Sequence, residues 1–299
     1  MRSTIRTFAA ALLIAFLVPA AHAAALQFDD RKLVYTSDAT GHTESELPAL
    51  FDRLLADPKP LVLFIHGRGN EPQKSLVKAG FFLRLAGGGR AVHKLESYGA
   101  NVVMISWESK AKRTDRLIPL SHMDAAQRTV ASVLDAFAAA RARRATALPQ
   151  PQAITLLAHS MGTIVLQTYV DAHNWNFQRP LFTNVALTSA DADGAGHANW
   201  VDKIAAVENV FITVNADDKV LRESAHQPKN REHPPLGREP GVALAGKASY
   251  ITIRTKAHEI FAPSPDRSNL TRFFDALVKN ERPAALLRPG AAPNQFQLQ

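Results

Sequence analysis

Short runs of apolar residues alternate with longer stretches of helical periodicity along most of the chain. The runs are bounded by Pro, Gly or polar residues and have the length of buried strands. Strands are therefore predicted over 33–35, 61–65, 101–107, 153–158, 184–188, 210–214 and 249–253. The Ala-rich stretch 123–144 is predicted to be a helix whose apolar face comprises Val130, Val133, Leu134 and Phe137. Further helices are predicted over 75–85, 162–171, 200–207 and 270–278.

This alternation of strands and helices is typical of an α/β fold. Parallel strands are joined by crossover helices and are covered on both faces, so they consist of continuous apolar residues. The predicted fold is therefore a mostly parallel central sheet with helices on both faces. Two segments rich in Pro, Ala, Gly and Gln interrupt the pattern, and 223–247 and the tail 281–299 are predicted to be loop and disordered chain.

The first residues have the layout of a secretory signal peptide. Arg2 and Arg6 provide a positive start, a short apolar run follows, and Ala21-His22-Ala23 has the small-x-small form of a cleavage site. We therefore expect residues 1–23 to be removed and the protein to be exported, as a periplasmic or secreted protein. A retained N-terminal membrane anchor is the alternative. The remaining chain is expected to form one domain over residues 24–280.

Composition narrows the chemistry that the chain can perform. Of its 299 residues 46% are hydrophobic and 21% are charged, an ordinary globular composition that excludes disorder throughout. The chain has no cysteine, which excludes disulfides, thiolate metal sites and a thiol nucleophile. Asp191, Asp193 and His197 lack the further oxygen ligands of a calcium loop, so no metal and no cofactor are predicted. Covalent catalysis would therefore need an oxygen or nitrogen nucleophile.

The formal net charge of +8 raises the question of an anionic partner. Basic residues gather at 110–113, 141–144 and 222–238, but these patches are scattered and carry no interleaved aromatic residues or nucleic-acid motif. We therefore predict no nucleic-acid partner and interpret the patches as solvated faces. Weak contact with an anionic membrane surface stays open, and no oligomeric state is predicted.

The clearest chemical motif follows the predicted strand 153–158. The sequence Ala158-His159-Ser160-Met161-Gly162 is a small-x-Ser-x-Gly motif between a strand and a helix. A turn this sharp requires small residues two positions before and two positions after the serine, as Ala158 and Gly162 are. The turn holds the hydroxyl above the sheet, close to a helix N-terminus that favours negative charge. Ser160 is therefore the candidate nucleophile, and the alternative is that it only caps the helix.

A serine nucleophile needs a base, and the base needs a carboxylate that orients it. His258 follows the last predicted strand and precedes the last helix, which places it at the carboxyl edge of the sheet as the candidate base. Asp218 is the preferred acid and, like Asp217, follows the predicted strand 210–214. Asp217 and Asp193 are the alternatives.

Acyl transfer also needs hydrogen-bond donors for the oxyanion that forms in the transition state. The backbone N–H of Met161, the residue after the candidate nucleophile, is the first candidate. The second is the backbone N–H of Arg68 in the sequence His66-Gly67-Arg68-Gly69-Asn70. The glycines on either side of Arg68 allow the backbone to approach a substrate closely. The alternative is a plain Gly-rich turn between a strand and a helix.

These segments resemble the α/β-hydrolase superfamily over residues 60–280. The matching segments are Phe64-Ile65-His66-Gly67-Arg68-Gly69, Ile105-Ser106-Trp107-Glu108-Ser109, the Ser160 motif, Asn215-Ala216-Asp217-Asp218-Lys219-Val220-Leu221 and His258-Glu259. A narrower likeness is to a little-characterised bacterial branch, through the serine-tryptophan strand end, the Ser160 motif, Ala190-Asp191-Ala192-Asp193 and the Asp-Lys-x-Leu turn. Ala158 replaces the usual first glycine of the serine motif, and Glu108 stands where that branch tends to have proline.

The resemblance implies a serine hydrolase with an acyl-enzyme intermediate. Ser160 would be the nucleophile, His258 the general base and then acid, and Asp218 the group that orients the imidazole. We expect a carboxylic ester hydrolase of the esterase or lipase type, acting on small-molecule or lipid esters. Other acyl-transfer activities (thioesterase, peptidase, acyltransferase) and a non-catalytic exported binding protein on the same scaffold are the alternatives.

The resemblance also suggests how the site is reached. Members of the superfamily usually carry a large lid in the segment that corresponds to 189–209, which here has room for one helix. No large lid domain is therefore expected. The loop 222–247 is expected to border the mouth of the site as a mobile basic rim.

Overall fold

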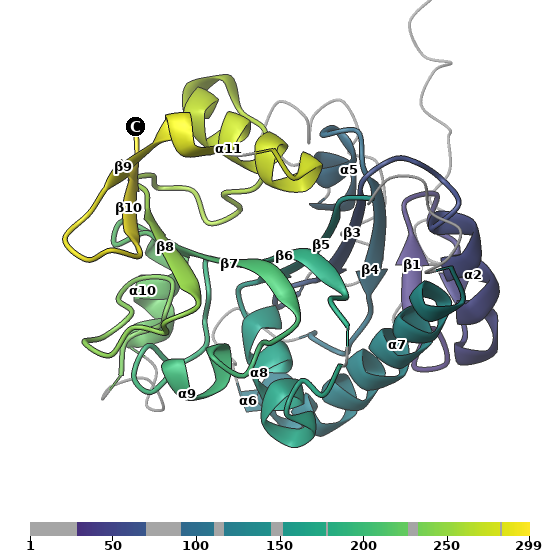
Figure 1. Ribbon diagram of the computed structural model, residues 1–299. Coiled ribbons are helices and arrows are strands. Elements are labelled where there is room, and N and C mark those ends of the chain that lie inside the picture. The colour runs from purple at the N-terminus through teal and green to yellow at the C-terminus, as the bar shows by residue number, and fades with distance from the viewer. Residues whose placement is uncertain are drawn as a thin grey trace, which may run out of the picture.

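Figure 1 shows the protein as a computed structural model. The structure describes residues 29–69, 91–110, 117–144, 152–177, 179–226, 233–281 and 283–299. The predicted signal peptide 1–23 and the predicted helix 75–85 lie outside the described residues, as does most of the basic patch 110–113.

In the described part of the chain the strands form a 10-stranded sheet in the order β2-β1-β4-β3-β5-β6-β7-β8-β10-β9. Neighbours from β4 to β10 in this order pair in parallel, whereas β1, β2 and β9 pair antiparallel at the edges. The strands are β1 Val34–Thr36, β2 Gly41–His42, β3 Leu61–Ile65, β4 Asn101–Ile105, β5 Ile154–His159, β6 Phe182–Thr188, β7 Val207–Val214, β8 Ala248–Thr252, β9 Leu287–Pro289 and β10 Gln295–Leu298.

Helices cover both faces of this sheet (Figure 1). Helices α2, α7 and α8 pack on one face, and α5 and α11 pack on the other. The helices are α2 Leu47–Leu54, α5 Ala91–Glu96, α6 Leu117–Ser121, α7 Met123–Arg144, α8 Gly162–His173, α9 Ala198–Val201, α10 Lys219–Ala225 and α11 Ser268–Lys279, with 3-10 turns at Glu44–Glu46, Pro265–Arg267 and Pro283–Leu286. The predicted α/β fold with a mostly parallel central sheet is therefore confirmed.

The chain between β6 and β7 is described throughout and holds the short helix α9 alone. No large lid lies in this segment, as the sequence predicts. Among the described helices, none is both long and apolar enough to span a membrane.

The central strands are buried on both sides. Leu61, Leu63 and Ile65 of β3 belong to the core under α7 and α8, whereas Val62 and Phe64 belong to the core under α11. All of these side chains are fully buried. Continuous apolar runs are thus a consequence of covering both faces of a parallel sheet.

The C-terminal tail 281–299 differs from its prediction. It is not disordered in the described residues, because β10 extends the sheet beside β8 and β9 turns back along it. Phe296 and Leu298 pack against the core under α11, and the side chain of Asn294 donates to backbone oxygens before β8 and at its start, both at 3.0 Å. The expectation of disorder was wrong because the Pro and Gly residues of the tail form turns and its alternating apolar residues find a partner strand.

The stretch 233–247 also differs from the predicted mobile rim. Leu236 and Ala245 are fully buried. The backbone of Leu236 donates to Ala192 O at 2.8 Å, and Gly237 donates to Ala190 O at 2.8 Å. This part of the loop is irregular but packed onto the end of β6, and its prolines shape turns rather than preventing order. Residues 227–232 of the same loop lie outside the described part.

Leu236→Ala is therefore expected to destabilise the protein by about 2–5 kcal/mol, because it leaves a cavity under the loop. Val242→Ala, in the same stretch, is the matched control, since Val242 is fully exposed. Denaturant unfolding of the two variants measures the difference. A Leu236→Ala variant as stable as the control would show that the loop is not packed in solution.

Candidate active site

Strand β5 ends in a sharp turn that carries Ser160 and leads into α8. Ser160 has a φ of 54°, a left-handed conformation that is unfavourable for a residue with a side chain. The end of β6 holds this conformation in place. The N–H of Ser160 donates to Thr188 O at 3.0 Å, and the N–H of Asp191 donates to Ser160 O at 3.2 Å. The serine thus stands at the carboxyl edge of the sheet between a strand and a helix.

The close approach of β3 requires a small residue at position 162, two positions after the serine. A Cβ atom on Gly162 would lie 2.4 Å from Ile65 O and 2.7 Å from His66 O. Both are backbone atoms, which cannot rotate away as the end of a side chain can. The first turn of α8 can therefore pass the end of β3 only with a glycine at this position.

Gly162→Ala is expected to destabilise the protein by about 1–3 kcal/mol, because β3 or α8 must shift to admit the methyl group. Gly246→Ala is the control, since a Cβ there would meet nothing within 4 Å. Chemical denaturation gives both free energies of unfolding. Equal values for the two variants would contradict the close contact.

Asp218 and His258 meet at neighbouring strand ends. Nδ1 of His258 is 2.8 Å from Oδ2 of Asp218. The other oxygen of Asp218 accepts from the N–H groups of Val220 at 2.9 Å and Leu221 at 3.0 Å, which caps α10. Because a carboxylate only accepts hydrogen bonds, the neutral imidazole carries its proton on Nδ1. Its Nε2 is then available as a base.

The structure distinguishes the three candidate acids. Asp217 is exposed to solvent. Asp193 accepts from the N–H of Ala195 at 2.9 Å within its own turn. Of the three, the structure brings Asp218 to His258.

Asp218 is fully buried, yet its pKa is lowered. Burial raises the pKa of the carboxyl, but the hydrogen bond and the Coulombic attraction of His258 lower it. The hydrogen bond from the N–H of Leu221 lowers it further. The carboxyl is therefore ionised at neutral pH and can stabilise positive charge on the imidazole.

Several contacts fix the loop that carries His258. The hydroxyl of Ser189 donates to His258 O at 2.7 Å. Lys94 forms an ion pair with Glu259, the next residue, and the side chain of Asn215 donates to the backbone of the same loop at 2.8 Å. Sequence reasoning missed these three residues, because their contacts join elements that are far apart along the chain.

The loop after β3 lies directly against Ser160. A Cβ atom on Gly67 would be 2.8 Å from the Cβ of Ser160 and 3.4 Å from its Oγ. The structure therefore brings the loop of Arg68 and the turn of Met161 to the same serine. Among the described residues, no acceptor takes the backbone N–H of Arg68 or of Met161. Within this part of the chain, both amides can therefore donate to a ligand.

Residues 44–231 match the model of a family described as alpha/beta hydrolase of unknown function, DUF900. The chain belongs to this family. The matched segment of this α/β hydrolase includes Ser160 and Asp218 and ends before His258. No curated protein matches the sequence significantly.

The solved structures that this chain matches include several esterases. One is a cold-adapted esterase from an Arctic intertidal metagenomic library, with 16% identity over 75% of this chain and 83% of that chain and a TM-score of 0.38. Another is esterase B from Lactobacillus rhamnosis, with 15% identity over 74% and 77% and a TM-score of 0.37. A third is Est1E from Butyrivibrio proteoclasticus with bound ferulic acid, with 13% identity over 75% and 88% and a TM-score of 0.37. These likenesses are too distant to indicate an activity.

Two buried histidines of the hydrolase adjoin the site. The ring of His159 lies 4.8 Å from that of His258, between ring centroids, and 5.0 Å from that of Phe261. Burial lowers the pKa of His159 well below its usual value, and the charge of His258 lowers it further. Burial likewise lowers the pKa of His66 to about 4. Both rings are therefore neutral at neutral pH.

The stability of the hydrolase is expected to fall as the pH decreases below 6.5, the ordinary histidine pKa. His66 and His159 then take up protons in the unfolded chain but stay neutral in the folded protein. The unfolded state binds more protons, so the free energy of unfolding falls by up to about 1.4 kcal/mol per pH unit for each histidine. Their contribution is complete above pH 6.5 and is lost toward pH 4, where His66 titrates when folded. Denaturant unfolding at pH 6.5 and at pH 4 measures how much the free energy of unfolding changes, and equal free energies at the two pH values would contradict this prediction.

Asp191, Asp193 and His197 do not assemble a metal site. Nδ1 of His197 lies 2.7 Å from Gly194 O, and its Nε2 is bonded to the hydroxyl of Tyr250. Both ring nitrogens are therefore used within the protein. In the described ranges, no group of three or more His, Cys, Asp or Glu side chains is placed to hold a metal ion.

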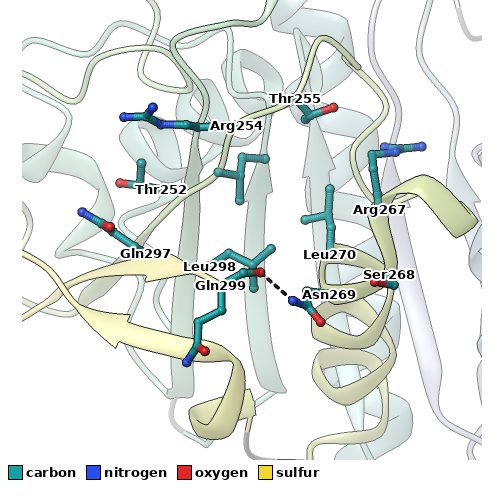
Figure 2. A pocket seen from close by; sticks show the side chains of 11 residues that line it. Thr252, Arg254, Thr255, Arg267, Ser268, Asn269, Leu270, Gln297, Leu298 and Gln299 are labelled. Carbon is teal, nitrogen blue, oxygen red and sulfur yellow. Dashed lines mark hydrogen bonds between the residues drawn. The ribbon is translucent and has the colours of Figure 1, made fainter.

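A separate pocket of about 420 Å³ lies beside the end of β8 and the start of α11 (Figure 2). Leu270 and Leu298 lie near its centre, and the guanidinium groups of Arg254 and Arg267 point away from it on opposite sides. The two charged groups therefore do not converge on one point, as the polar groups of a substrate site usually do. The candidate site of the hydrolase therefore stays at Ser160.

Proposed function

We propose that this α/β hydrolase is a serine hydrolase that cleaves carboxylic esters. The observation that carries the proposal is the 2.8 Å contact between His258 and the buried Asp218, at the sheet edge where a strained turn presents Ser160. Acyl transfer needs a positioned hydroxyl, a base held in one tautomer and donors for an oxyanion. The site offers a candidate for each.

In the proposed reaction, Oγ of Ser160 attacks the carbonyl carbon of the ester while Nε2 of His258 takes the hydroxyl proton. The carboxylate of Asp218 accepts the hydrogen bond from Nδ1–H of His258 and stabilises the imidazolium. When the tetrahedral intermediate collapses, the bond to the alcohol oxygen breaks and the imidazolium gives its proton to the leaving group. Water, deprotonated by His258, then attacks the acyl-enzyme and releases the carboxylic acid and the serine.

The proposed oxyanion donors are the backbone N–H groups of Arg68 and Met161. Each is free of a protein acceptor in the described residues, and each belongs to a segment that adjoins Ser160. A donor of this kind typically contributes about 3 kcal/mol, because it is already aimed at the charge that develops in the transition state.

Substrate class and location are part of the proposal. Small-molecule or lipid esters are the proposed substrates, and the short connection between β6 and β7 favours esters that reach Ser160 without displacing a large lid. Residues 1–23 have the pattern of a signal peptide, so we place the enzyme in the periplasm or outside the cell. Without Arg2 and Arg6 of the signal peptide the formal net charge falls from +8 to +6, and this remaining positive charge supports weak contact with an anionic membrane surface.

A fluorophosphonate probe tests the proposal directly. The purified protein is expected to be labelled at Ser160, as located by peptide mass spectrometry, and to hydrolyse short p-nitrophenyl esters faster than thioesters or aminopeptide substrates. Amidase activity without esterase activity would overturn the substrate class. Salt-sensitive binding to anionic vesicles without labelling would instead favour the non-catalytic binding protein.

A further inference from the structure

The strand end Ile105-Ser106-Trp107 is one of the segments through which the chain resembles α/β hydrolases, yet it contributes nothing to the proposed triad. We infer that Trp107 and His66 are positioning residues that orient the peptide groups of the loop after β3 toward Ser160. The inference rests on the proposed function, because it assigns both side chains a role in the same reaction.

The indole of Trp107 holds the first peptide group of the loop. Its Nε1–H donates to His66 O at 2.8 Å, and its ring stacks on the imidazole of His66 with centroids 5.5 Å apart and planes 19° apart. The C=O and N–H of a trans peptide point in opposite directions, and the described chain has no cis peptide. Fixing His66 O therefore fixes the direction of the Gly67 N–H.

The imidazole of His66 holds the second peptide group. Its Nδ1 lies 2.9 Å from Gly67 O. Because a carbonyl oxygen only accepts, Nδ1 must carry the proton and donate it. This bond fixes the Gly67 carbonyl, and so it fixes the Arg68 N–H on the opposite side of the same peptide. That N–H is the proposed oxyanion donor.

If the side chain at position 66 served only for packing, an apolar residue would suit this site better than histidine. Its side chain is fully buried, and within the described residues its Nε2 has no hydrogen-bond partner. A buried acceptor without a partner costs free energy, which an apolar side chain of similar size would avoid. The bond from Nδ1 to the loop is what a histidine adds here. Because burial lowers the pKa of His66 to about 4, the ring remains a neutral Nδ1 donor at neutral pH.

The end of β4 supplies contacts on both sides of Arg68. Before Arg68, the indole of Trp107 holds the peptide between His66 and Gly67. After Arg68, the N–H of Gly69 donates to Ser109 O at 3.2 Å. Donors fixed in this way need no reorganisation when the oxyanion forms, which is the condition under which they lower the barrier. The positioning is therefore expected to act on the transition state rather than on substrate binding.

Trp107→Phe and His66→Leu test the inference. The first keeps an aromatic ring and loses Nε1–H, and the second loses Nδ1–H. Each is expected to lower kcat for a p-nitrophenyl ester by about 10- to 100-fold with little change in KM, since the oxyanion forms only in the transition state. Inhibition by an alkyl trifluoromethyl ketone, whose serine adduct carries an oxyanion, should weaken by the same factor as kcat/KM. His66→Asn places an amide N–H near the position of Nδ1 and should recover most of kcat.

Trp175→Phe is the matched control. Trp175 is also fully buried, and its Nε1 has no hydrogen-bond partner in the part of the chain that the structure describes. This variant makes the same change in side-chain volume without removing a hydrogen bond, so its kcat and ketone affinity should stay at the wild-type values. Thermal melting shows whether each variant is folded, and Trp107→Phe decides the inference alone if His66→Leu does not fold.

The inference is overturned if Trp107→Phe keeps wild-type kcat and ketone affinity, or if KM rises while ketone affinity is unchanged. Failure of His66→Asn to exceed a folded His66→Leu in kcat would also overturn it. These outcomes presuppose an active wild-type enzyme. A wild-type protein that neither reacts with the fluorophosphonate nor hydrolyses esters would instead overturn the proposed function, and the inference with it.

Discussion

Ser160→Ala is expected to lower kcat/KM for short p-nitrophenyl esters by at least about 10⁴-fold. The variant lacks the oxygen of the proposed nucleophile, so neither the proposed tetrahedral adduct nor the acyl-enzyme can form on it. His258, Asp218 and the backbone donors remain, which leaves only slow attack by water. Initial rates on purified variant and wild type measure the effect. Fluorophosphonate labelling should disappear together with the activity.

The serine side chain contributes little to stability, so the loss should not come from unfolding. Ser160 is nearly buried, and its φ of 54° is as unfavourable for alanine as for serine. Ser106→Ala is a suitable control, because Ser106 is a buried serine directly after β4 whose hydroxyl has no hydrogen-bond partner among the described residues. The control should retain wild-type rates. A Ser160→Ala variant that matches it would remove Ser160 as the nucleophile.

Helix α7 and strand β3 illustrate what the sequence alone can predict. Helix α7 covers Met123–Arg144, the range that its apolar periodicity predicts, and β3 covers Leu61–Ile65, the predicted run. Both follow from local patterns. A helix buries one stripe of residues, and a central parallel strand buries every residue. Such patterns need no knowledge of the partner element.

The tail and the loop before β8 illustrate what local patterns cannot predict. The backbone of Phe296 pairs with Ile251 of β8, and Leu236 is buried against the end of β6. Pro and Gly around these residues have the composition of disordered chain and of ordered turns alike. Which of the two occurs depends on whether the neighbouring apolar residues meet a partner. That partner is distant along the chain.

Some residues of the candidate site can likewise be predicted from local patterns, whereas others depend on the tertiary structure. Ser160 and His258 could be named from the sequence because each follows a strand at the carboxyl edge of the sheet. The sequence favours Asp218 over Asp217 through the resemblance of its Asp-Lys-x-Leu turn, but which of the two carboxylates meets His258 is not a local property, since both follow β7. It depends on where α10 begins, because the residue that caps α10 is turned inward and the one before it faces solvent. The sequence indicates Trp107 only through a resemblance, since its contact with His66 O forms only when β3 and β4 lie side by side.

Asp218→Asn is expected to lower kcat by about 10³–10⁴-fold at neutral pH. The amide of asparagine can donate to Nδ1 of His258, which would place the imidazole proton on Nε2 and leave no base for Ser160. It also removes the negative charge that stabilises the imidazolium. Helix α10 should survive the change, because asparagine caps helices as well as aspartate does and can accept from Val220 and Leu221.

Asp217→Asn is the matched control for this variant, since it makes the same chemical change one residue earlier at an exposed position. Its kcat should stay within about twofold of the wild type, because a solvent-exposed charge is strongly screened. Fluorophosphonate labelling followed over time separates the effect on the base from any loss of binding. The Asp218→Asn protein should react slowly and completely, because Ser160 remains in place. If Asp217→Asn were the slow variant and Asp218→Asn kept its activity, the carboxylate that orients His258 during turnover would not be the one that caps α10.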